Sequence, residues 1–261
     1  MSTLHAHIEG IGFWSRGLPS WQAAQDYVRD GSAPDVTPSK PSPQLLAPNE
    51  RRRAPETVAV ALEVALAACT HAGRDPASLP SIFASTHGDL AITDYMCSTL
   101  ASEPRTISPT RFHNSVHNAA AGYWTIGTGA MQPATALSAY DHSFAQALLE
   151  AMVQLATGSE AVLLVGYDSE ATGPLAHVSR SVGLLGGALV LARQPRAGSI
   201  GLRVRLDDGE TTDHDGPLSS HARGNAMTRM LPLFDALAAR QSHTRLKAGA
   251  GRVLQLELMH D

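Results

Sequence analysis

The hydrophobic positions in the first part of the chain predict one strand and two helices. Residues 5–14 alternate in part between apolar and polar side chains, which predicts a first strand. Trp21–Val28 fits a short helix, and residues 55–72 are apolar on nearly every side, as is typical of a helix buried between layers. Between them, residues 31–48 are rich in proline, which excludes a helix and predicts an extended surface loop.

The remaining pattern alternates short strands with helices. Asp89 is placed to cap a helix that carries Ile92, Met96 and Leu100. A long helix from His142 ends at Gly158. Strands are predicted at 81–86, 135–139, 161–165, 183–192, 200–206 and 253–258, with a polar loop up to residue 224 and an amphipathic helix over 227–237. Buried strands that alternate with helices imply a layered α/β sheet.

Composition narrows the class of protein. Of 261 residues, 43% are hydrophobic and 17% are charged, which favours one large α/β domain or two modest ones over a disordered chain. A formal net charge of −4 argues against a nucleic-acid binder, which normally carries a basic excess. No apolar run reaches the ~18–20 residues of a membrane span, and the first ten residues do not resemble a signal peptide. We therefore expect a soluble, cytoplasmic protein.

Cysteines, glycines and arginines add little specific chemistry. Cys69 and Cys97 both fall in predicted helices, so two buried thiols are expected rather than a disulfide. The glycines at 183–187 precede a strand rather than follow one, and they do not match a dinucleotide-binding fingerprint. Arg51–Arg53 form the only dense basic run, which suits either a solvated face or an acidic partner.

The histidines do not predict a metal site. His113 and His117 stand four residues apart, but Pro109 and the polar residues between them favour a turn that leads into a helix. No third ligand is near, so hydrogen-bonded structural histidines are the better interpretation. His214 lies between two aspartates and is expected in a solvated surface loop.

The turn over residues 138–143 joins a strand to the long helix. A nucleophile there would lie at the helix N-terminus, among backbone N–H donors that can activate a side chain. Its apex is Tyr140, and a phenol, which ordinarily titrates at about pH 10, is a poor acyl acceptor at neutral pH. The turn therefore has the shape of a catalytic site without a suitable nucleophile.

A run of small residues followed by a strand, a turn and a buried helix is the most distinctive part of the chain. It comprises Ile107, Phe112, Asn114, Ser115, Val116, Asn118, Ala120, Gly122, residues 135–144, Gly158 and the strand to Gly166, after Gly10, Ile11, Gly12 and the 53–73 helix. This order resembles the β-ketoacyl synthases of the thiolase superfamily. In that family a strand delivers a catalytic cysteine into the first turn of a buried helix. Residues 138–139 and 143–144 match the flanks of that cysteine, and Tyr140 stands in its place.

The resemblance implies a thiolase-like layered α/β/α fold with a truncated second half. Residues 1–195 correspond to the N-terminal domain of a β-ketoacyl synthase, and residues 196–261 to a shortened strand–helix–strand portion that completes the same domain. The family's histidine-glycine-threonine signature is missing from that portion, and His221 and His243 lack the family's context.

A synthase-like chain without the cysteine resembles a chain-length factor, the non-catalytic partner of an active β-ketoacyl-ACP synthase in polyketide biosynthesis. Shortened chains of this kind are similar to the corresponding component of aryl polyene and xanthomonadin-type pathways. The resemblance implies a heterodimer, transient contact with an acyl carrier protein and no cofactor. It places Phe112, Asn118, Gly122, Tyr123, Trp124, Met131 and Tyr140 at the acyl tunnel or interface, with core packing as the alternative for the aromatic residues. Arg51, Arg52 and Arg53, the dense basic run, are the candidate residues for docking of the acidic carrier protein.

Two other functions stay open at this point. One is an independent thiolase-fold enzyme that uses Ser143 or Tyr140 with His142 or His113 for acyl transfer or thioester hydrolysis. It requires a hydrogen bond between nucleophile and base, whereas adjacent positions on a helix do not face each other. The other is a self-paired module that binds acyl carriers.

Overall fold

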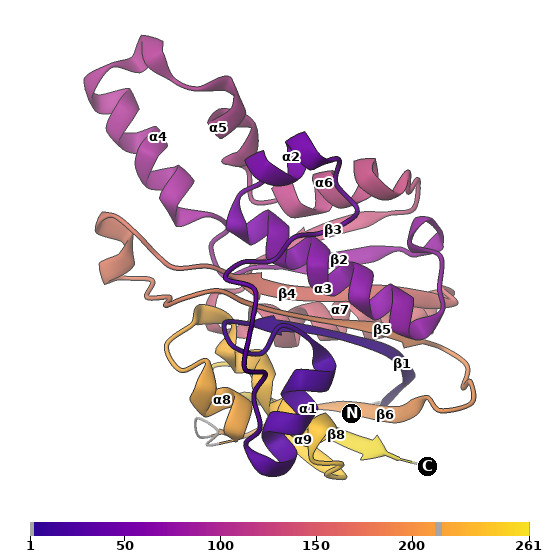
Figure 1. The fold of residues 1–261 in the computed structure, drawn as a ribbon. Coiled ribbons are helices and arrows are strands. Elements are labelled where there is room, and N and C mark those ends of the chain that lie inside the picture. Colours follow the sequence, from indigo (N-terminus) through magenta and orange to yellow (C-terminus); the bar gives the residue numbers. More distant parts are fainter. Residues whose placement is uncertain (1–2, 212–215, 261) are drawn as a thin grey trace.

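Eight strands form one mixed sheet in the part of the chain that the structure describes (Figure 1). The computed structural model describes residues 3–211 and 216–260. The strands are β1 (Leu4–Ser15), β2 (Ser81–Ala84), β3 (Ala134–Leu137), β4 (Ala161–Asp168), β5 (Leu185–Ala192), β6 (Ile200–Asp208), β7 (His243–Gly249) and β8 (Arg252–Met259). Their order across the sheet is β3-β2-β4-β5-β1-β6-β8-β7. The β3, β2 and β4 strands are parallel, whereas every later neighbour in the sheet is antiparallel.

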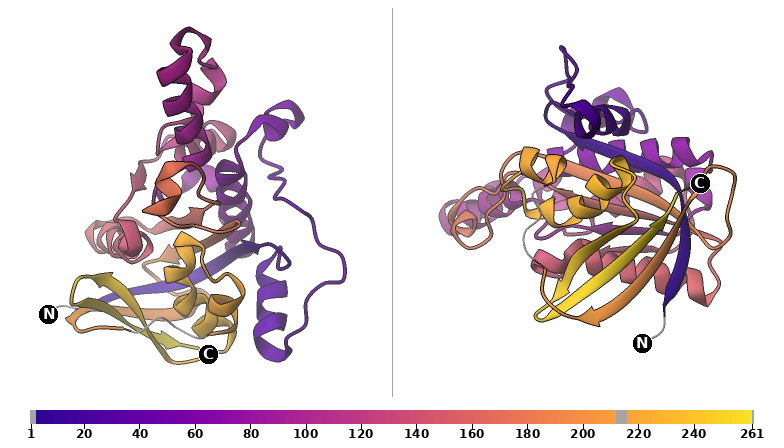
Figure 2. Two further views of the ribbon diagram at one scale, coloured as in Figure 1. Left: turned by 90° about the vertical axis from the view of Figure 1, so that its left-hand side faces the viewer. Right: turned by 90° about the horizontal axis from the view of Figure 1, so that it is seen from below.

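Helices cover both faces of the sheet (Figures 1 and 2). They are α1 (Trp21–Asp30), α2 (Pro48–Arg53), α3 (Glu56–Ala72), α4 (Leu90–Ser102), α5 (Pro109–Asn114), α6 (Ala119–Thr128), α7 (Ser143–Thr157), α8 (Pro217–His221) and α9 (Leu231–Ala238). Helices α3 and α6 share one core with Phe83, and α1, α7 and α9 share the other with Phe13. The α/β/α layering predicted from the sequence is confirmed.

Helix α3 is buried because the strand beneath it has no side chains at the closest points. Gly10 and Gly12 of β1 lie against the backbone carbonyls of Ala68 and Val64, and a Cβ atom at either glycine would overlap those oxygens. Ten residues of the helix are consequently buried, on nearly every side. The two glycines of the sequence pattern thus set the distance between sheet and helix.

The strands at the centre of the sheet are buried along their whole length. All eight residues of β4 and all eight of β5 are shielded from water, because helices lie over both faces at this point. This agrees with the prediction of a strand buried on both faces over residues 161–165.

The region after residue 200 differs most from the sequence prediction. Strands β6 and β8 match predicted strands, but β7 is an additional strand that forms an antiparallel hairpin with β8. Its sequence alternates weakly, because only Leu246 and Ala248 supply buried apolar side chains. The strand–helix–strand expectation is therefore incomplete.

The helix predicted over 227–237 is also not a single amphipathic helix. A 3₁₀ turn, η5 (Ala226–Met230), precedes α9, and the first seven residues of α9 are buried. Pro232 lacks the N–H that would continue a helix from the preceding turn, so the α-helix begins anew at Leu231. The predicted polar loop before it contains α8.

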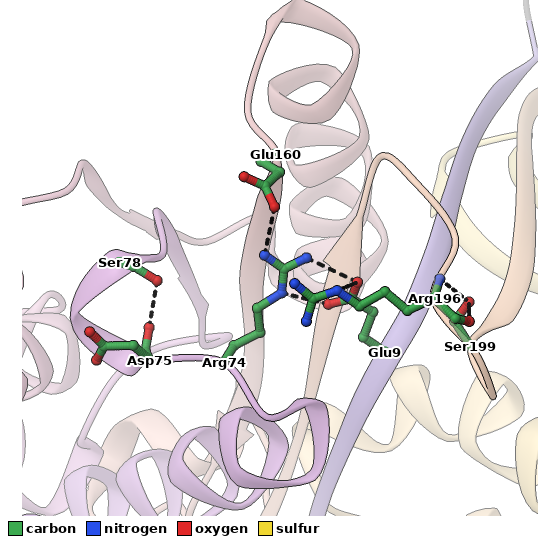
Figure 3. Close-up of polar contacts among 7 residues, drawn as sticks. All are labelled: Glu9, Arg74, Asp75, Ser78, Glu160, Arg196 and Ser199. Atoms are coloured by element: carbon green, nitrogen blue, oxygen red, sulfur yellow. Dashed lines mark hydrogen bonds and ion pairs between the residues drawn. The ribbon is translucent and has the colours of Figure 1, made fainter.

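A charged network ties β1 to neighbouring elements (Figure 3). The Glu9 carboxylate accepts hydrogen bonds from Nε and Nη2 of Arg74 at 2.7 and 3.0 Å, and it pairs with Arg196 at 3.3 Å. Arg74 also donates to Glu160 at 2.9 Å. The side chains of Glu9 and Arg74 are only 3% and 12% exposed. Hydrogen bonding to Glu9 raises the pKa of Arg74, and the Arg74 guanidinium lowers the pKa of Glu160.

The two cysteines differ in exposure. Both are free; Cys69 is buried on α3, whereas Cys97 is exposed on α4. The expectation of two buried thiols is therefore wrong for Cys97. The reason is that α4 buries only Leu90, so its helical spacing does not correspond to a covered face.

This difference predicts selective alkylation. Burial raises the pKa of the Cys69 thiol to about 12, so very little reactive thiolate is present at pH 8. We expect iodoacetamide at that pH to modify Cys97 and to leave Cys69 unmodified in the folded protein, as measured by peptide mass spectrometry. In urea, both cysteines are expected to react. Equal modification of the two in the folded protein would contradict the burial of α3.

Candidate functional site

The strand β3 lies at the edge of the sheet. It pairs with β2 on one side, and within residues 3–211 and 216–260 no strand covers its other side. Ala134 is exposed and the next three residues are half-buried. The unpaired N–H and C=O groups of an edge strand are a template for pairing with another chain. This edge is therefore open to a partner.

The turn after β3 holds Tyr140 in the left-handed backbone region, with a φ of 51°. The residue begins a 3₁₀ turn, η3 (Tyr140–His142), that leads into α7. The Ser143 hydroxyl donates to the Tyr140 carbonyl at 2.7 Å and accepts from the Ala139 N–H at 2.9 Å. The Tyr140 phenol donates to the Val178 carbonyl at 3.0 Å, in the loop formed by residues 169–184. Ser143 thus fixes the turn, and Tyr140 joins it to the 169–184 loop.

This geometry does not pair a nucleophile with a base. Ser143 is 2% exposed. Its hydroxyl bonds to the backbone of the turn, at Ala139 and Tyr140. His113 stacks edge-on against Tyr123 with ring centroids 5.9 Å apart. In the part of the chain that the structure describes, no hydrogen bond joins Ser143 or Tyr140 to a histidine, and His142 Nδ1 is buried without a partner. The geometry that acyl transfer by such a pair needs is therefore not assembled.

Large apolar side chains are exposed on the elements that adjoin β3. Met131, in the segment before β3, is 94% exposed, and Ile126 on α6 is 79% exposed. We call the exposed set the apolar rim, and its members are Phe112, Val116, Ile126, Met131 and Tyr140. Contiguous apolar surface marks an interaction site more often than a single exposed side chain does. Ile126 lies near the end of α6 and Met131 in the segment that leads from it into β3.

An arm made of α4 and α5 projects past the β3 edge (Figures 1 and 2). We define the arm as residues 88–118. Asp89 at its base caps α4 by accepting from the Ile92 N–H at 3.0 Å, and it accepts from the Thr57 hydroxyl at 2.9 Å. The Ser108 N–H donates to the Tyr95 hydroxyl at 3.1 Å and so joins the two helices. Each helix buries only one residue, which leaves most of the arm in contact with solvent.

The remaining interface residues predicted from the sequence occupy different environments. Trp124 is fully buried, with its ring centroid 6.2 Å from that of Phe83, so it belongs to the core. Gly122 and Tyr123 are half-buried on α6. The exposed members of the predicted set are Phe112, Asn118, Met131 and Tyr140.

The arginine run lies at the end of a short helix. Its position just before the long helix had suggested that it would start that helix instead. Arg51–Arg53 are the last residues of α2, where they complement the helix dipole, and Pro55 separates them from α3. Arg51 folds back to donate to the Leu46 carbonyl at 2.9 Å, and Arg52 donates to the Asn49 side chain. Arg53 lines a groove of about 680 Å³ between α2, the base of the arm and the 169–184 loop.

A buried carboxylate lies beneath the base of the arm. Asp168, the last residue of β4, accepts a hydrogen bond from the Ser85 hydroxyl at 2.6 Å and from the Thr86 N–H at 3.1 Å. Burial raises the pKa of Asp168, against the opposing effects of His87 and these hydrogen bonds. Asp168 is not among the site residues predicted from the sequence. The available signal was that β2 and β4, both buried and parallel, end in polar residues at the same edge.

His113 and His117, which stand four residues apart, make separate contacts. Over the described ranges, no group of three or more His, Cys, Asp or Glu residues is placed to hold a metal ion. His113 ends α5 near Tyr123, whereas His117 Nε2 donates to the Ser85 carbonyl at 3.0 Å. His214 lies outside the described residues. No helix in the described part combines the length and the apolar character needed to cross a bilayer.

The conformation at position 140 predicts an unusual order of stability. A residue other than glycine in the left-handed region costs roughly 1 kcal/mol, which glycine avoids. We expect Tyr140→Gly to have a free energy of unfolding about 1 kcal/mol higher than Tyr140→Ala, as measured by urea titration. Both variants lack the phenol, so the comparison isolates the backbone. Equal stability would mean that the turn relaxes out of this conformation.

Comparisons with known proteins complete the description of the site. Residues 20–252 match the family model described as the β-ketoacyl synthase N-terminal domain. None of the curated proteins compared with the chain matches it.

Three solved structures are similar in fold. One is from the complex of the ketosynthase ApeO with its chain length factor ApeC from Xenorhabdus doucetiae, with a TM-score of 0.72, 20% identity, and coverage of 98% of this chain and 97% of that chain. Another is from AntDE:AntF, described as a type II PKS acyl-carrier protein in complex with its ketosynthase, with a TM-score of 0.75, 11% identity and 100% coverage of both chains. A β-ketoacyl synthase from Burkholderia phymatum STM815 matches with a TM-score of 0.60 and 15% identity, over 92% of this chain and 71% of that chain. These likenesses confirm the thiolase-like fold.

Proposed function

Because the chain belongs to the β-ketoacyl synthase N-terminal domain family, we propose that it is a non-catalytic, chain-length-factor-like subunit. It pairs through the β3 edge with an active β-ketoacyl-ACP synthase in the cytoplasm, and it narrows that partner's acyl tunnel in polyketide or aryl polyene biosynthesis. One observation carries the proposal. Tyr140 stands at the apex of the turn beside an open edge strand, and the sequence resemblance assigns this position to the family's catalytic cysteine.

The similar chains that come from complexes are matched along nearly their whole length, which supports a protein that works in an assembly. The chain matches chains of the ApeO–ApeC and AntDE:AntF complexes over 97% and 100% of their lengths. It covers 71% of the β-ketoacyl synthase from Burkholderia phymatum. The chains that it matches end to end come from assemblies described as containing a ketosynthase and a second protein.

The β3 edge and the apolar rim suit a lasting heterodimer. Pairing β3 with a strand of the synthase would satisfy its open backbone groups, and closing the two surfaces would remove Met131 and Ile126 from water. Interfaces between obligate partners are large and more apolar than transient ones. The arm extends beyond the same edge, so it adds area to this interface.

Tyr140 acts by excluding volume. Its phenol is held by the bond to the Val178 carbonyl, so the ring keeps one position at the end of the strand. An acyl chain that grows in the partner toward this boundary stops where further carbon atoms would overlap the ring. Phe112 on α5 and Met131 in the segment before β3 are exposed as well, and they are the further candidates for this limit.

The exposed arginines of α2 are the proposed docking point for an acyl carrier protein. Arg51 is engaged with the backbone, which leaves Arg52 and Arg53 at the surface. Arg111 lies across the groove from Arg53, with its guanidinium 4.0 Å above the Tyr95 ring. Electrostatic contacts of this kind steer a transient, acidic partner.

The test is co-expression with the β-ketoacyl synthase encoded beside this chain, followed by size exclusion and elongation of carrier-bound malonyl substrate. We expect a one-to-one complex, and Tyr140→Ala is expected to shift the products toward longer chains. If no complex forms and the isolated chain turns over an acyl thioester, the chain is an independent enzyme and the proposal fails. If a complex forms but its product lengths do not change with Tyr140→Ala, the proposed pairing stands and the proposed role of Tyr140 in limiting chain length is wrong.

A further inference from the structure

Two exposed segments begin at neighbouring points in the sheet. The arm starts just after β2, and the 169–184 loop starts just after β4, and these two strands are adjacent and parallel. Both segments reach the side of the molecule that carries the β3 edge: the arm projects past it, and the loop accepts the hydrogen bond from Tyr140. The residues that fix the arm and the loop relative to each other therefore determine the shape of the surface that a partner contacts.

The Asp168 carboxylate holds the start of the arm. It accepts from the Ser85 hydroxyl at 2.6 Å, and the same hydroxyl accepts from the Gly88 N–H at 2.8 Å. The Thr86 N–H donates to both carboxylate oxygens at 3.1 Å. Ser85 and Asp168 are both fully buried. The turn that leads into α4 is thus bound to a single carboxylate that water does not reach.

The end of the arm returns to the same place. His117, next to its last residue, donates from Nε2 to the Ser85 carbonyl at 3.0 Å. Ser85 therefore contacts the beginning of the arm through its hydroxyl and the end of the arm through its backbone. The arm is closed at its base by one serine, and that serine is held by Asp168.

The backbone of Asp168 holds the loop. The Asn225 side-chain amide donates to the Asp168 carbonyl at 3.2 Å and to the Val182 carbonyl at 3.1 Å, so it joins the two ends of the loop. Asn225 is itself buried. Further along the loop, Gly173 packs so closely against Asp94 of α4 that a Cβ atom would overlap the Asp94 side chain. The arm and the loop are therefore both held at Asp168, and they also contact each other where Gly173 meets Asp94.

We propose that Asp168 is a positioning residue that sets the arm and the 169–184 loop as one unit for the partner. This inference rests on the proposed function, because it names the element that gives the interface its shape. Asp168 acts through Ser85 on the arm and through Asn225 on the loop, and it does not itself face the partner. We call the group formed by Asp168, Ser85 and Asn225 the Asp168 junction.

A matched pair of serine variants tests this role. Ser85→Ala removes the hydroxyl that bonds to Asp168. Ser219→Ala removes an equivalent buried hydroxyl that donates to the buried Asp235 carboxylate at 2.7 Å, at the start of α8 and outside the junction. The readouts are amide hydrogen exchange of the isolated chain, followed by mass spectrometry, and the dissociation constant for the β-ketoacyl synthase.

We expect Ser85→Ala to speed exchange about tenfold in residues 88–118 and to weaken partner binding about tenfold. Ser219→Ala is expected to speed exchange only near residues 217–221 and to leave the dissociation constant unchanged within about twofold. Unchanged exchange in the arm of Ser85→Ala overturns the proposal. Equal weakening of binding by both variants overturns it too, because the effect would then be general destabilisation.

Two further variants keep the outcome decisive. His117→Phe removes only the contact at the end of the arm, so it is expected to speed exchange in the arm and not in the loop. Asn225→Ala is expected to speed exchange in residues 169–184, and failure of either pattern contradicts the junction. If the wild-type chain does not bind the synthase, the proposed function fails, while the exchange data still decide whether the Asp168 junction fixes the two segments.

Discussion

Glutamate at both Ile126 and Met131 is expected to abolish co-purification of this chain with its β-ketoacyl synthase. The two side chains are 79% and 94% exposed in the single chain, so the substitutions leave its own packing intact. Burying each apolar side chain at an interface contributes about 1.5–3 kcal/mol, and an unpaired buried carboxylate adds a penalty. We therefore expect the dissociation constant to rise by at least about 100-fold, as measured by titration calorimetry or by size exclusion.

Val36→Glu is the control for this double variant. Val36 is an apolar side chain that is 89% exposed, but it lies in the proline-rich 31–48 loop and not beside β3. It is expected to leave the complex intact. If Val36→Glu disrupts the complex as strongly as the double variant does, or if the double variant binds normally, the apolar rim is not the interface.

Replacing Glu9 by glutamine is expected to lower the free energy of unfolding by about 3 kcal/mol. The change leaves Arg74, which is 12% exposed, without its buried charged partner and with only the exposed carboxylate of Glu160. Removing one member of a buried pair costs far more than the pair contributes when intact. It also deprives Arg196 of its contact, so the turn after α3 and the turn before β6 lose the carboxylate of β1 that they share. Urea unfolding at neutral pH measures the effect.

Asp26→Asn provides the matched comparison for Glu9→Gln. Asp26 pairs with Arg29 on the exposed side of α1, where solvent screens the interaction. This variant is expected to unfold at the same urea concentration as the wild type. An equally small effect of Glu9→Gln would show that water or Glu160 compensates the Arg74 guanidinium and that the network does not stabilise the fold.

Much of the fold follows from local patterns that the structure preserves. The buried character of residues 55–72 predicts α3 because a helix with no polar face must lie between layers. Asp89 predicts the start of α4, since its carboxylate accepts the Ile92 N–H as a cap does. The turn over 138–143 is predictable on other grounds. A strand that leads directly into an apolar helix leaves little conformational freedom for the residues between them.

What the sequence cannot supply is the environment that only distant residues create. The apolar spacing of α4 suggests a covered face, but no other element in the described part packs over most of it, so Cys97 and Leu100 are exposed. Trp124 is equally apolar in the sequence and is fully buried, because α6 packs on α3. Asp168 becomes notable only when β4 is placed next to β2 and its carboxylate meets Ser85.

The position of β1 in the sheet sets the order in which the chain can complete its fold. This strand is made first, but its neighbours are β5 and β6, which are formed by residues 185–208. At about 5–20 residues per second, a ribosome reaches those neighbours roughly 10–40 s after it has made β1. During that interval the first strand has neither of its hydrogen-bonding partners, so the sheet closes late and through contacts distant in sequence, which makes folding slow. The first strand therefore stays without a strand partner until residues 185–208 have been synthesised.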